Sequence, residues 1–145
     1  APSSITRLQN MGTPDYLISA ACQLVVAQRL ARKNCKECRV PDDDVTPKVL
    51  QDLGFTAELA SRVKALKGKG CGKCNNTGYK GRQGIYEILV VTKPLKEAIL
   101  RQATTPELRE IGVKEGFQTM QDMGRRLIAS GELNFREFER VLSGE

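Results

Sequence analysis

Two cysteine pairs constrain this chain more than any other feature of its sequence. Cys35 and Cys38 form one C-x-x-C pair, Cys71 and Cys74 form the other, and 32 residues separate the two pairs. Both thiolates of such a pair can bind the same ion, and two pairs complete a tetrahedral Cys₄ site. We therefore predict that these four cysteines bind one structural zinc ion.

The spacing of the pairs also predicts a module with secondary structure of its own. Simple zinc ribbons place only about 15–20 residues between their two pairs. The insert here contains Thr46-Pro47, a typical helix start, and its apolar residues predict helices near 47–53 and 57–66. We expect residues 35–79 to form a tetracysteine zinc-binding module.

Other uses of the cysteines stay open on sequence alone. A redox dithiol of the thioredoxin type usually has a single pair on a βαβ unit, a pattern that this chain lacks. Disulfides need an oxidising compartment, which no secretory signal supports, whereas an iron–sulfur cluster would also accept four cysteines. Catalytic zinc is disfavoured because four thiolates leave no open position for water. The fifth cysteine, Cys22, is interpreted as a small buried residue of its helix rather than as a ligand.

The composition excludes several classes of enzyme. The 145-residue chain has no histidine, so it cannot by itself form a Ser-His-Asp triad, a Cys-His dyad or a two-histidine zinc protease site. Its 23 Lys and Arg against 17 Asp and Glu give a formal charge of +6, which indicates an anionic partner only weakly. No apolar run of 18 residues predicts a transmembrane helix, and no signal peptide is visible. Because the sequence starts at Ala1 in a helical pattern, we expect a piece of a longer protein.

Hydrophobic periodicity predicts a mainly helical α+β chain with one short antiparallel strand pair. Residues 24–30 and 84–91 are strand-like segments, which we expect to pair and to close the insert at its neck. The helices predicted outside the insert cover residues 3–11, 14–22, 94–102, 106–115, 119–130 and 135–142.

Local signals mark the ends of several of these helices. Thr13-Pro14 predicts an N-cap followed by proline at the first helical position, and the segment 104–107 (Thr-Thr-Pro-Glu) carries a capping box. Asn134-x-x-Glu137 is a variant of the same box. Gly116 and Gly131 are natural helix stops. The final helices look like a small bundle.

Two longer stretches resemble a known family. Residues 26–33 (VAQRLARK) and 70–87 (GCGKCNNTGYKGRQGIYE) are similar to segments of the type II secretion and type IV pilus assembly ATPases. The second stretch is close to the tetracysteine signature of that family and to the strand after it. The resemblance runs in order along the whole chain and covers the C-terminal third of the family's architecture.

The resemblance implies an incomplete enzyme. The family's phosphate-binding loop, its acidic Mg²⁺ boxes and its His box precede this region, and here the best match to the loop, Gly72-Lys73, continues into Cys74. We therefore expect no catalytic residue in this chain, with ATP and Mg²⁺ bound only in the full-length parent. By resemblance, that parent is a hexameric cytoplasmic motor, peripheral at the inner membrane of a bacterium. Its partners would be the rest of the ATPase core, neighbouring subunits and an inner-membrane platform protein.

The resemblance also divides the chain. Residues 1–34 and 80–91 would complete the edge of a RecA-like ATPase core, 35–79 would be the zinc module, and 92–145 the C-terminal helical subdomain. The resemblance also implies that Arg82, shortly after the second cysteine pair, lies near the bound nucleotide or the subunit interface of the parent. An arginine suits that position because its fork pairs with phosphate or stacks on adenine. The simpler interpretation of Arg82 is a surface arginine on a turn.

The rival interpretations are a zinc ribbon that binds nucleic acid and a module for protein interaction. A nucleic-acid binder should gather basic and aromatic residues on one face. In this sequence the basic residues are dispersed, and three aspartates at 42–44 follow the first cysteine pair. We therefore expect no nucleic acid among the partners.

Overall fold

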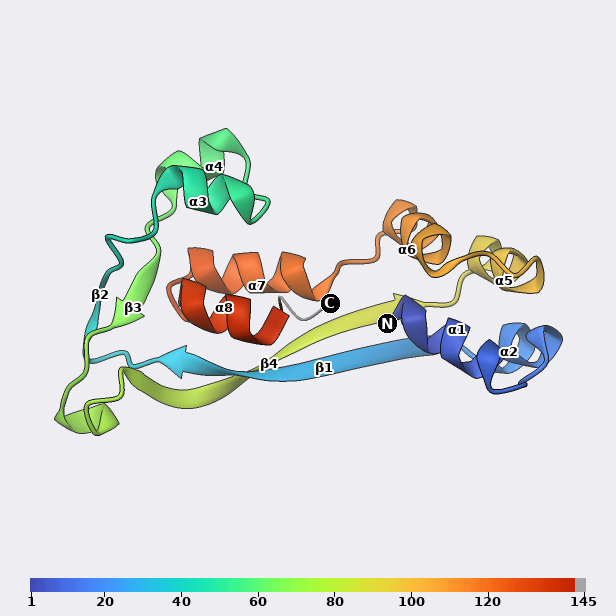
Figure 1. Ribbon diagram of the computed structural model, residues 1–145, viewed down its shortest axis with the longest axis horizontal. Helices are drawn as coiled ribbons and strands as arrows, with labels where there is room; N and C mark the ends of the chain where they lie inside the picture. The colour runs from blue at the N-terminus through green and yellow to red at the C-terminus, as the bar shows by residue number, and fades with distance from the viewer. Residues whose placement is uncertain (143–145) are drawn as a thin grey trace. The chain divides into compact units, whose positions relative to one another are not determined.

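The computed structural model describes residues 1–142 and confirms an α+β chain that is mostly helical (Figure 1). Two antiparallel strand pairs lie among the helices within this range. The elements in chain order are α1 (Pro2–Asn10), α2 (Asp15–Ala21), β1 (Leu24–Asn34), β2 (Arg39–Pro41), α3 (Pro47–Asp52), α4 (Ala57–Arg62), β3 (Leu66–Gly68), the single 3-10 turn η1 (Gly72–Cys74), β4 (Tyr79–Val90), α5 (Lys93–Leu100), α6 (Thr105–Lys114), α7 (Met120–Ala129) and α8 (Phe135–Leu142).

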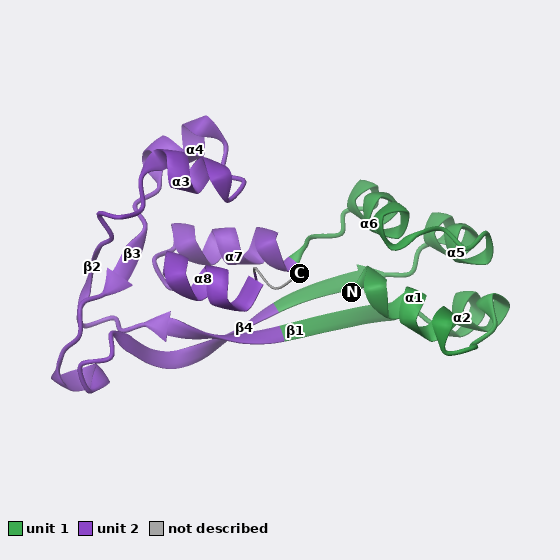
Figure 2. Cartoon of the chain, in the orientation of Figure 1, with its two compact units in different colours: residues 1–28, 86–119 green, residues 29–85, 120–145 purple. Residues whose placement is uncertain are grey.

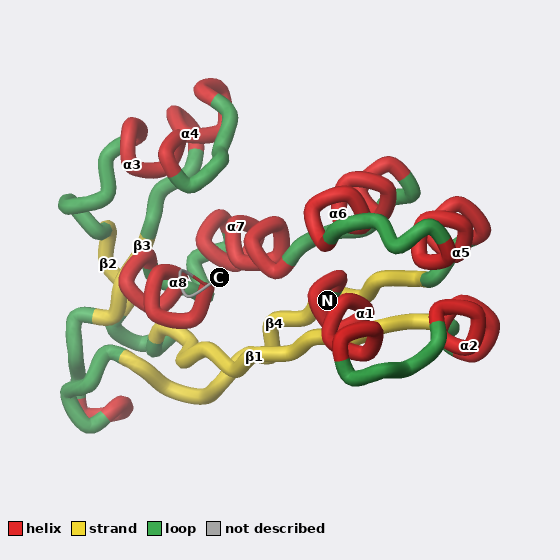
Figure 3. Tube along the Cα trace, turned by 45° about the vertical axis from the view of Figure 1, so that its right-hand side comes forward, coloured by secondary structure: helices red, strands yellow, loops and turns green. Residues whose placement is uncertain are grey.

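The predicted strand pair is present as β1 and β4, and both strands are longer than predicted (Figure 3). The Cys35 backbone N–H donates to the Gly78 carbonyl at 2.9 Å, and the Val91 N–H donates to the Gln23 carbonyl at 2.9 Å. Each bond joins the end of one strand to the start of the other, as antiparallel pairing requires. The extra residues are largely polar or glycine, so apolar alternation could not reveal them. Their backbone groups extend the ladder all the same.

The second strand pair, β2 with β3, was not predicted. Arg39 lies opposite Gly68 and Pro41 opposite Leu66 in this short ladder. The predicted helix over 57–66 is wrong at its end, because α4 stops at Arg62 and the chain turns extended at Val63 (φ −74°, ψ 129°). Leu66 therefore belongs to a strand whose partner lies 25 positions earlier, a pairing that local periodicity cannot reveal.

Helix ends follow the predicted signals with one exception. Thr46 and Thr104 cap their helices, accepting from the N–H groups of Val49 (3.3 Å) and Glu107 (3.4 Å). The predicted cap at Thr13 is wrong, since Pro14 is the N-cap of α2 and makes no side-chain bond. The Thr13 N–H instead donates to the Leu8 carbonyl at 3.1 Å, so Thr13 completes the turn that ends α1.

The chain forms two compact units, and the boundary between them falls within both long strands (Figure 2). The first unit comprises residues 1–28 and 86–119. Its helices pack in the pairs α1–α6, α2–α5 and α5–α6. Its core contains Ile5, Ile18, Leu89, Leu95, Ile99, Leu108 and Phe117.

The second unit begins at residue 29, runs to residue 85 and resumes at residue 120. It holds the four predicted ligand cysteines, the ladder of β2 with β3, and the helix pairs α3–α4 and α7–α8. Buried apolar side chains of this unit include Leu50, Ala60, Ile85, Met120, Ile128, Leu133 and Phe138. The predicted domain ranges concern the architecture of the parent and stay a prediction.

Close contact between α7 and α8 depends on a buried glycine. A Cβ atom on Gly124 would lie 2.6 Å from both Leu142 Cδ1 and Phe138 Cε2. Such distances require the aromatic ring to shift, because real Cβ contacts are longer.

We expect Gly124→Ala to destabilise the second unit by about 1 kcal/mol. Alanine favours the helix by up to about 1 kcal/mol, but overpacking a filled core costs about 1–3 kcal/mol, so the clash should prevail. Chemical denaturation measures the difference. A variant that is as stable as the native chain would show that α7 and α8 separate at little cost.

Candidate metal centre

The four predicted ligand cysteines lie together in the second unit. Cys35 directly follows β1, and Cys38 directly precedes β2. Cys71 directly precedes the turn η1, and Cys74 is its last residue. All four Sγ atoms lie within 4.8 Å of one another. Residues separated by up to 39 positions are thus brought to one point by the two strand ladders.

The spacing of the sulfur atoms fits a tetrahedral ion. The Sγ–Sγ distances are 3.8 Å for Cys35 and Cys71, 3.9 Å for Cys38 and Cys74, and 3.8 Å for Cys71 and Cys74. A tetrahedron with Zn–S bonds of about 2.3 Å has edges of about 3.8 Å. A disulfide would need about 2.05 Å, and all five cysteines are free thiols. The donor set and its spacing therefore suit a thiolate-binding metal.

Backbone N–H groups point at the sulfur atoms. Cys74 Sγ accepts from the N–H groups of Cys71 at 3.3 Å and Gly78 at 3.2 Å, and Cys38 Sγ accepts from Gly70 at 3.2 Å. Such bonds partly neutralise thiolate charge and fix the direction of each sulfur.

Glycines make this backbone path possible. Gly70 and Gly78 have φ angles of 104° and 80°, a region that residues with a Cβ rarely adopt. A Cβ on Gly68 would lie only 1.9 Å from the Gly78 carbonyl oxygen. Any side chain at Gly68 would therefore push apart the segments that carry Cys38 and Cys74.

Without a metal, the thiols of Cys74 and Cys38 have pKa values shifted in opposite directions. Burial raises the pKa of the Cys74 thiol, but hydrogen bonds from the Cys71 and Gly78 N–H groups and the neighbouring thiols outweigh burial and lower it to about 6. The pKa of the Cys38 thiol is raised to about 11, chiefly by burial. The hydrogen bond from the Gly70 N–H lowers this pKa, but the hydrogen bonds with the other three thiols raise it further. One sulfur is thus already disposed to be a thiolate, the form that binds metals.

Cys22 lies outside this group. It directly follows α2, is half-buried rather than fully buried, and packs against the core of the first unit. The prediction of a buried residue within its helix is wrong, because α2 ends at Ala21 and Cys22 is only partly buried. Cys22 is not among the four cysteines that the structure groups.

A buried carboxylate beside the cysteine module was missed by the sequence analysis. Glu137 is fully buried at the start of α8, where its Oε1 accepts from Arg32 Nη2 at 3.0 Å and from Arg140 Nε at 2.6 Å. The Arg32 guanidinium also lies 4.1 Å from the centroid of the Tyr79 ring. Asn134 caps α8 as predicted, since its Oδ1 accepts from the Glu137 N–H at 2.7 Å. The Asn-x-x-Glu pattern predicted the cap, but it did not predict that the Glu137 carboxylate binds Arg32 and Arg140.

Asn34 anchors the cysteine module to the turn between α7 and α8. It is buried directly before Cys35, its N–H donates to the Glu132 carbonyl at 2.8 Å, and its Nδ2 donates to the Gly131 carbonyl at 2.9 Å. Nothing in its sequence context marks it, because the partners lie about 97 positions away.

Arg82 is exposed on β4 and is not part of the cysteine group. It lines a pocket of about 380 Å³ together with Arg32, Tyr79 and Lys80. This pocket combines three cationic side chains with one aromatic ring, a lining that suits an anionic group beside a planar one.

Comparison with known proteins identifies the family. A family model described as "Type II/IV secretion system protein" matches residues 1–140. The chain belongs to this family.

Members of the family with curated descriptions match almost the whole chain. The Type IV pilus assembly ATPase PilB of Myxococcus xanthus is 33% identical over 94% of the chain, and PilB of Pseudomonas aeruginosa is 36% identical over 97%. The Type II secretion system protein E of Aeromonas hydrophila is 36% identical over 97%. These alignments cover 24%, 25% and 27% of the three relatives, so the chain spans about a quarter of their length.

Among residues 1–142, none of the helices is long and apolar enough to cross a bilayer.

The Glu137 site predicts how stability depends on pH. Burial raises the pKa of this carboxyl, but hydrogen bonds from Arg140 and Arg32 outweigh burial and lower it from 4.5 to about 2. The stabilisation is therefore complete above about pH 4.5 and is lost as the pH falls through about 2. The displacement corresponds to about 3 kcal/mol at most, and solvent screening at the half-exposed arginines reduces this to about 1–2 kcal/mol.

Glu137→Gln should therefore lower the free energy of unfolding at pH 7 by about 1–2 kcal/mol and flatten its decline between pH 5 and 2. Urea titrations across this range measure both effects. The matched control is Glu58→Gln, since Glu58 and Arg62 form an exposed pair with 72% of each side chain accessible. Equal effects of the two substitutions would refute a special role for the buried carboxylate.

Proposed function

We propose that Cys35, Cys38, Cys71 and Cys74 bind one structural zinc ion. The proposal is supported by three Sγ–Sγ distances of 3.8–3.9 Å, by the grouping of all four Sγ atoms within 4.8 Å, and by the N–H groups directed at Cys38 and Cys74. A four-thiolate shell has no open position, so a bound zinc would crosslink the module and take no part in chemistry.

We further propose that the chain is the C-terminal part of an ATP-driven motor for type IV pilus assembly or type II secretion. The single observation that carries this proposal is the family match over residues 1–140. The relatives named above are assembly ATPases and secretion proteins, and they are about four times longer than the aligned region. Nucleotide hydrolysis is assigned to the parent because this sequence contains no G-x-x-x-x-G-K-[ST] loop to cradle the phosphates.

Exposed apolar residues support a role of the long strands at the edge of a larger core. Alternate residues of β1 and β4 in the first unit are about half accessible: Leu24 (53%), Val26 (50%), Ile88 (52%) and Val90 (57%). Large apolar side chains in such a row are costly in water and are typical of a surface that another part of a protein covers. We assign this surface to the ATPase core of the parent.

Arg82 is proposed as a nucleotide-proximal residue of the parent. Its pocket on β4 offers cationic groups and the Tyr79 ring, and no ion-pair partner of Arg82 is present among residues 1–142. The parent would be a hexamer at the cytoplasmic side of a bacterial inner membrane, in contact with its neighbouring subunits and a platform protein.

The zinc proposal predicts about one zinc ion per chain by elemental analysis. Cys71→Ser should lose the metal, since three thiolates no longer close the site. Cys22→Ser is the matched control, because Cys22 lies outside the cluster, and it should retain the metal. A folded chain with no metal, or with two disulfides among the four cysteines, would contradict the assignment.

Removal of zinc should also loosen the module selectively. Structural zinc supplies on the order of 10–16 kcal/mol of apparent binding energy at neutral pH. After chelation, amide exchange should accelerate in residues 35–79 more than in the helices of the first unit, which has its own core. Uniform protection in both units would argue against this coupling.

Arg82→Ala in the full-length parent should reduce ATP turnover by roughly tenfold or more while zinc content stays unchanged. The reason is that Arg82 lies outside the sulfur cluster but on the strand that follows it. Arg62→Ala, at an exposed position of α4, serves as the control for removal of one surface arginine. Unaltered turnover and nucleotide affinity in Arg82→Ala would return Arg82 to the ordinary surface arginines.

A further inference from the structure

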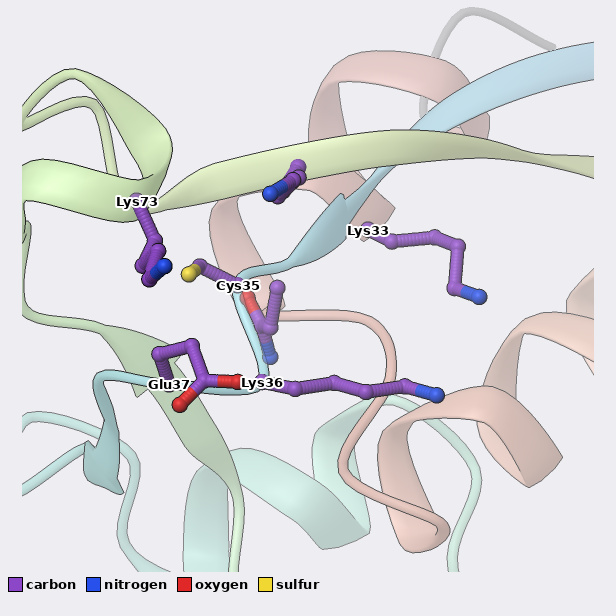
Figure 4. Close-up of a pocket in the computed structure, with 7 residues that line it drawn as sticks. Lys33, Cys35, Lys36, Glu37 and Lys73 are labelled. Atoms are coloured by element: carbon purple, nitrogen blue, oxygen red, sulfur yellow. The ribbon is translucent and has the colours of Figure 1, made fainter.

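A second basic pocket lies beside the cysteine cluster. It has a volume of about 360 Å³ and is lined by Lys33, Lys36, Lys73 and Lys80 together with Asn34, Cys35 and Glu37. Figure 4 shows Lys33 and Lys36 extending to the same side of the pocket, with Lys73 on the other side of Cys35 in this view. Four cations and one carboxylate therefore share a small concave surface.

The four lysines converge from different parts of the sequence. Lys33 lies at the end of β1 and Lys80 at the start of β4, whereas Lys36 and Lys73 are inner residues of the two C-x-x-C pairs. The sulfur cluster and the long ladder thus assemble the pocket. None of the four ammonium groups has an ion-pair partner among residues 1–142.

Two of these lysines lie on the paired strands, close to the end of the ladder that carries the cysteines. Cys35 and Gly78 share a backbone hydrogen bond, and Lys33 and Lys80 each lie two residues along their strands from it. Like charges on neighbouring strands destabilise a ladder. The Lys33 side chain runs beside Gly81, since its Cδ lies 3.8 Å from the position that a Cβ on Gly81 would occupy. An anion bound in the pocket would reduce the repulsion among the cations that line it.

We propose that this lysine pocket binds a compact phosphate-bearing anion of about the size of pyrophosphate. Lysine ammonium groups act as point charges that recognise phosphate without a fixed fork geometry. The volume is at the lower end of the range for ligand pockets, which fits a compact anion. The lining has no aromatic ring to stack a base, in contrast to the Arg82 pocket, which contains Tyr79.

The simpler alternative is that the lysines only balance the charge of the four thiolates. Two of them, Lys33 and Lys80, lie outside the C-x-x-C pairs, on the strands. Balance of the thiolates would make lysine removal lower metal retention and leave phosphate binding undetectable. The anion site predicts the opposite pattern, so the two explanations are separable.

The test is titration of the full 145-residue chain, carrying its metal, with inorganic pyrophosphate at constant ionic strength. Amide NMR signals of residues 33–37, 73 and 80 should shift, and the affinity should fall as salt is raised. Lys33→Ala with Lys80→Ala should weaken binding about tenfold. The control, Lys48→Ala with Lys64→Ala, removes the same charge from exposed positions that do not line the pocket and should leave the affinity unchanged.

Lys36→Ala with Lys73→Ala provides a second test on the cysteine-pair side of the pocket and should also weaken binding about tenfold. Equal weakening by the control pair, or the absence of saturable binding, would overturn the proposal. Parallel titrations with ATP distinguish the source of the phosphates. Equal affinity for ATP and pyrophosphate would identify free phosphate groups as the ligand, whereas tighter ATP binding with shifts at Tyr79 and Arg82 would identify a nucleotide tail.

Discussion

Antiparallel pairing of β1 with β4 is the constraint on which the rest of the second unit depends. The hydrogen bond between Cys35 and Gly78 closes a loop of more than forty residues and brings the first cysteine pair to the second. The short ladder of β2 with β3 continues the same approach on the far side of Cys38. Without these two ladders the four sulfur atoms would belong to separate, independently moving segments, and closing such a loop has an entropic cost that the ladder and a bound ion would offset together.

Local signals predicted most of the helices and the sulfur group, but not the long-range pairings. Thr46 and Thr104 mark helix starts because their caps involve residues only three positions away. Each C-x-x-C motif is equally local, so the sequence could predict that its two thiols lie together. The ladder of β2 with β3, the polar ends of β1 and β4, and the Asn34 anchor depend on partners far along the chain. The same holds for Glu137. The hydrogen bond from its N–H to the capping residue Asn134 could be predicted, whereas its pairing with Arg32 could not.

The distribution of charge shows why a formal charge of +6 was a weak guide. One carboxylate, Glu137, is buried and fully paired, so it contributes little to the field outside the second unit. Within residues 1–142, Lys33, Lys36, Lys73 and Lys80 have no ion-pair partner, and Lys80 lines both basic pockets described above. A dispersed pattern in sequence thus becomes a concentrated one in space, because the strand ladder and the sulfur cluster gather residues from four segments.

The contact between Gly68 and Gly78 has a consequence for how such modules are found in genomes. Neither residue is a candidate metal ligand, yet a Cβ at Gly68 would overlap the Gly78 carbonyl, and Gly78 also supplies an N–H to Cys74. A search pattern built on cysteine spacing alone would accept sequences whose backbones cannot bring the two pairs together. A pattern that also requires glycine at these two positions describes the steric condition for closure, and it would separate this architecture from chance occurrences of paired cysteines.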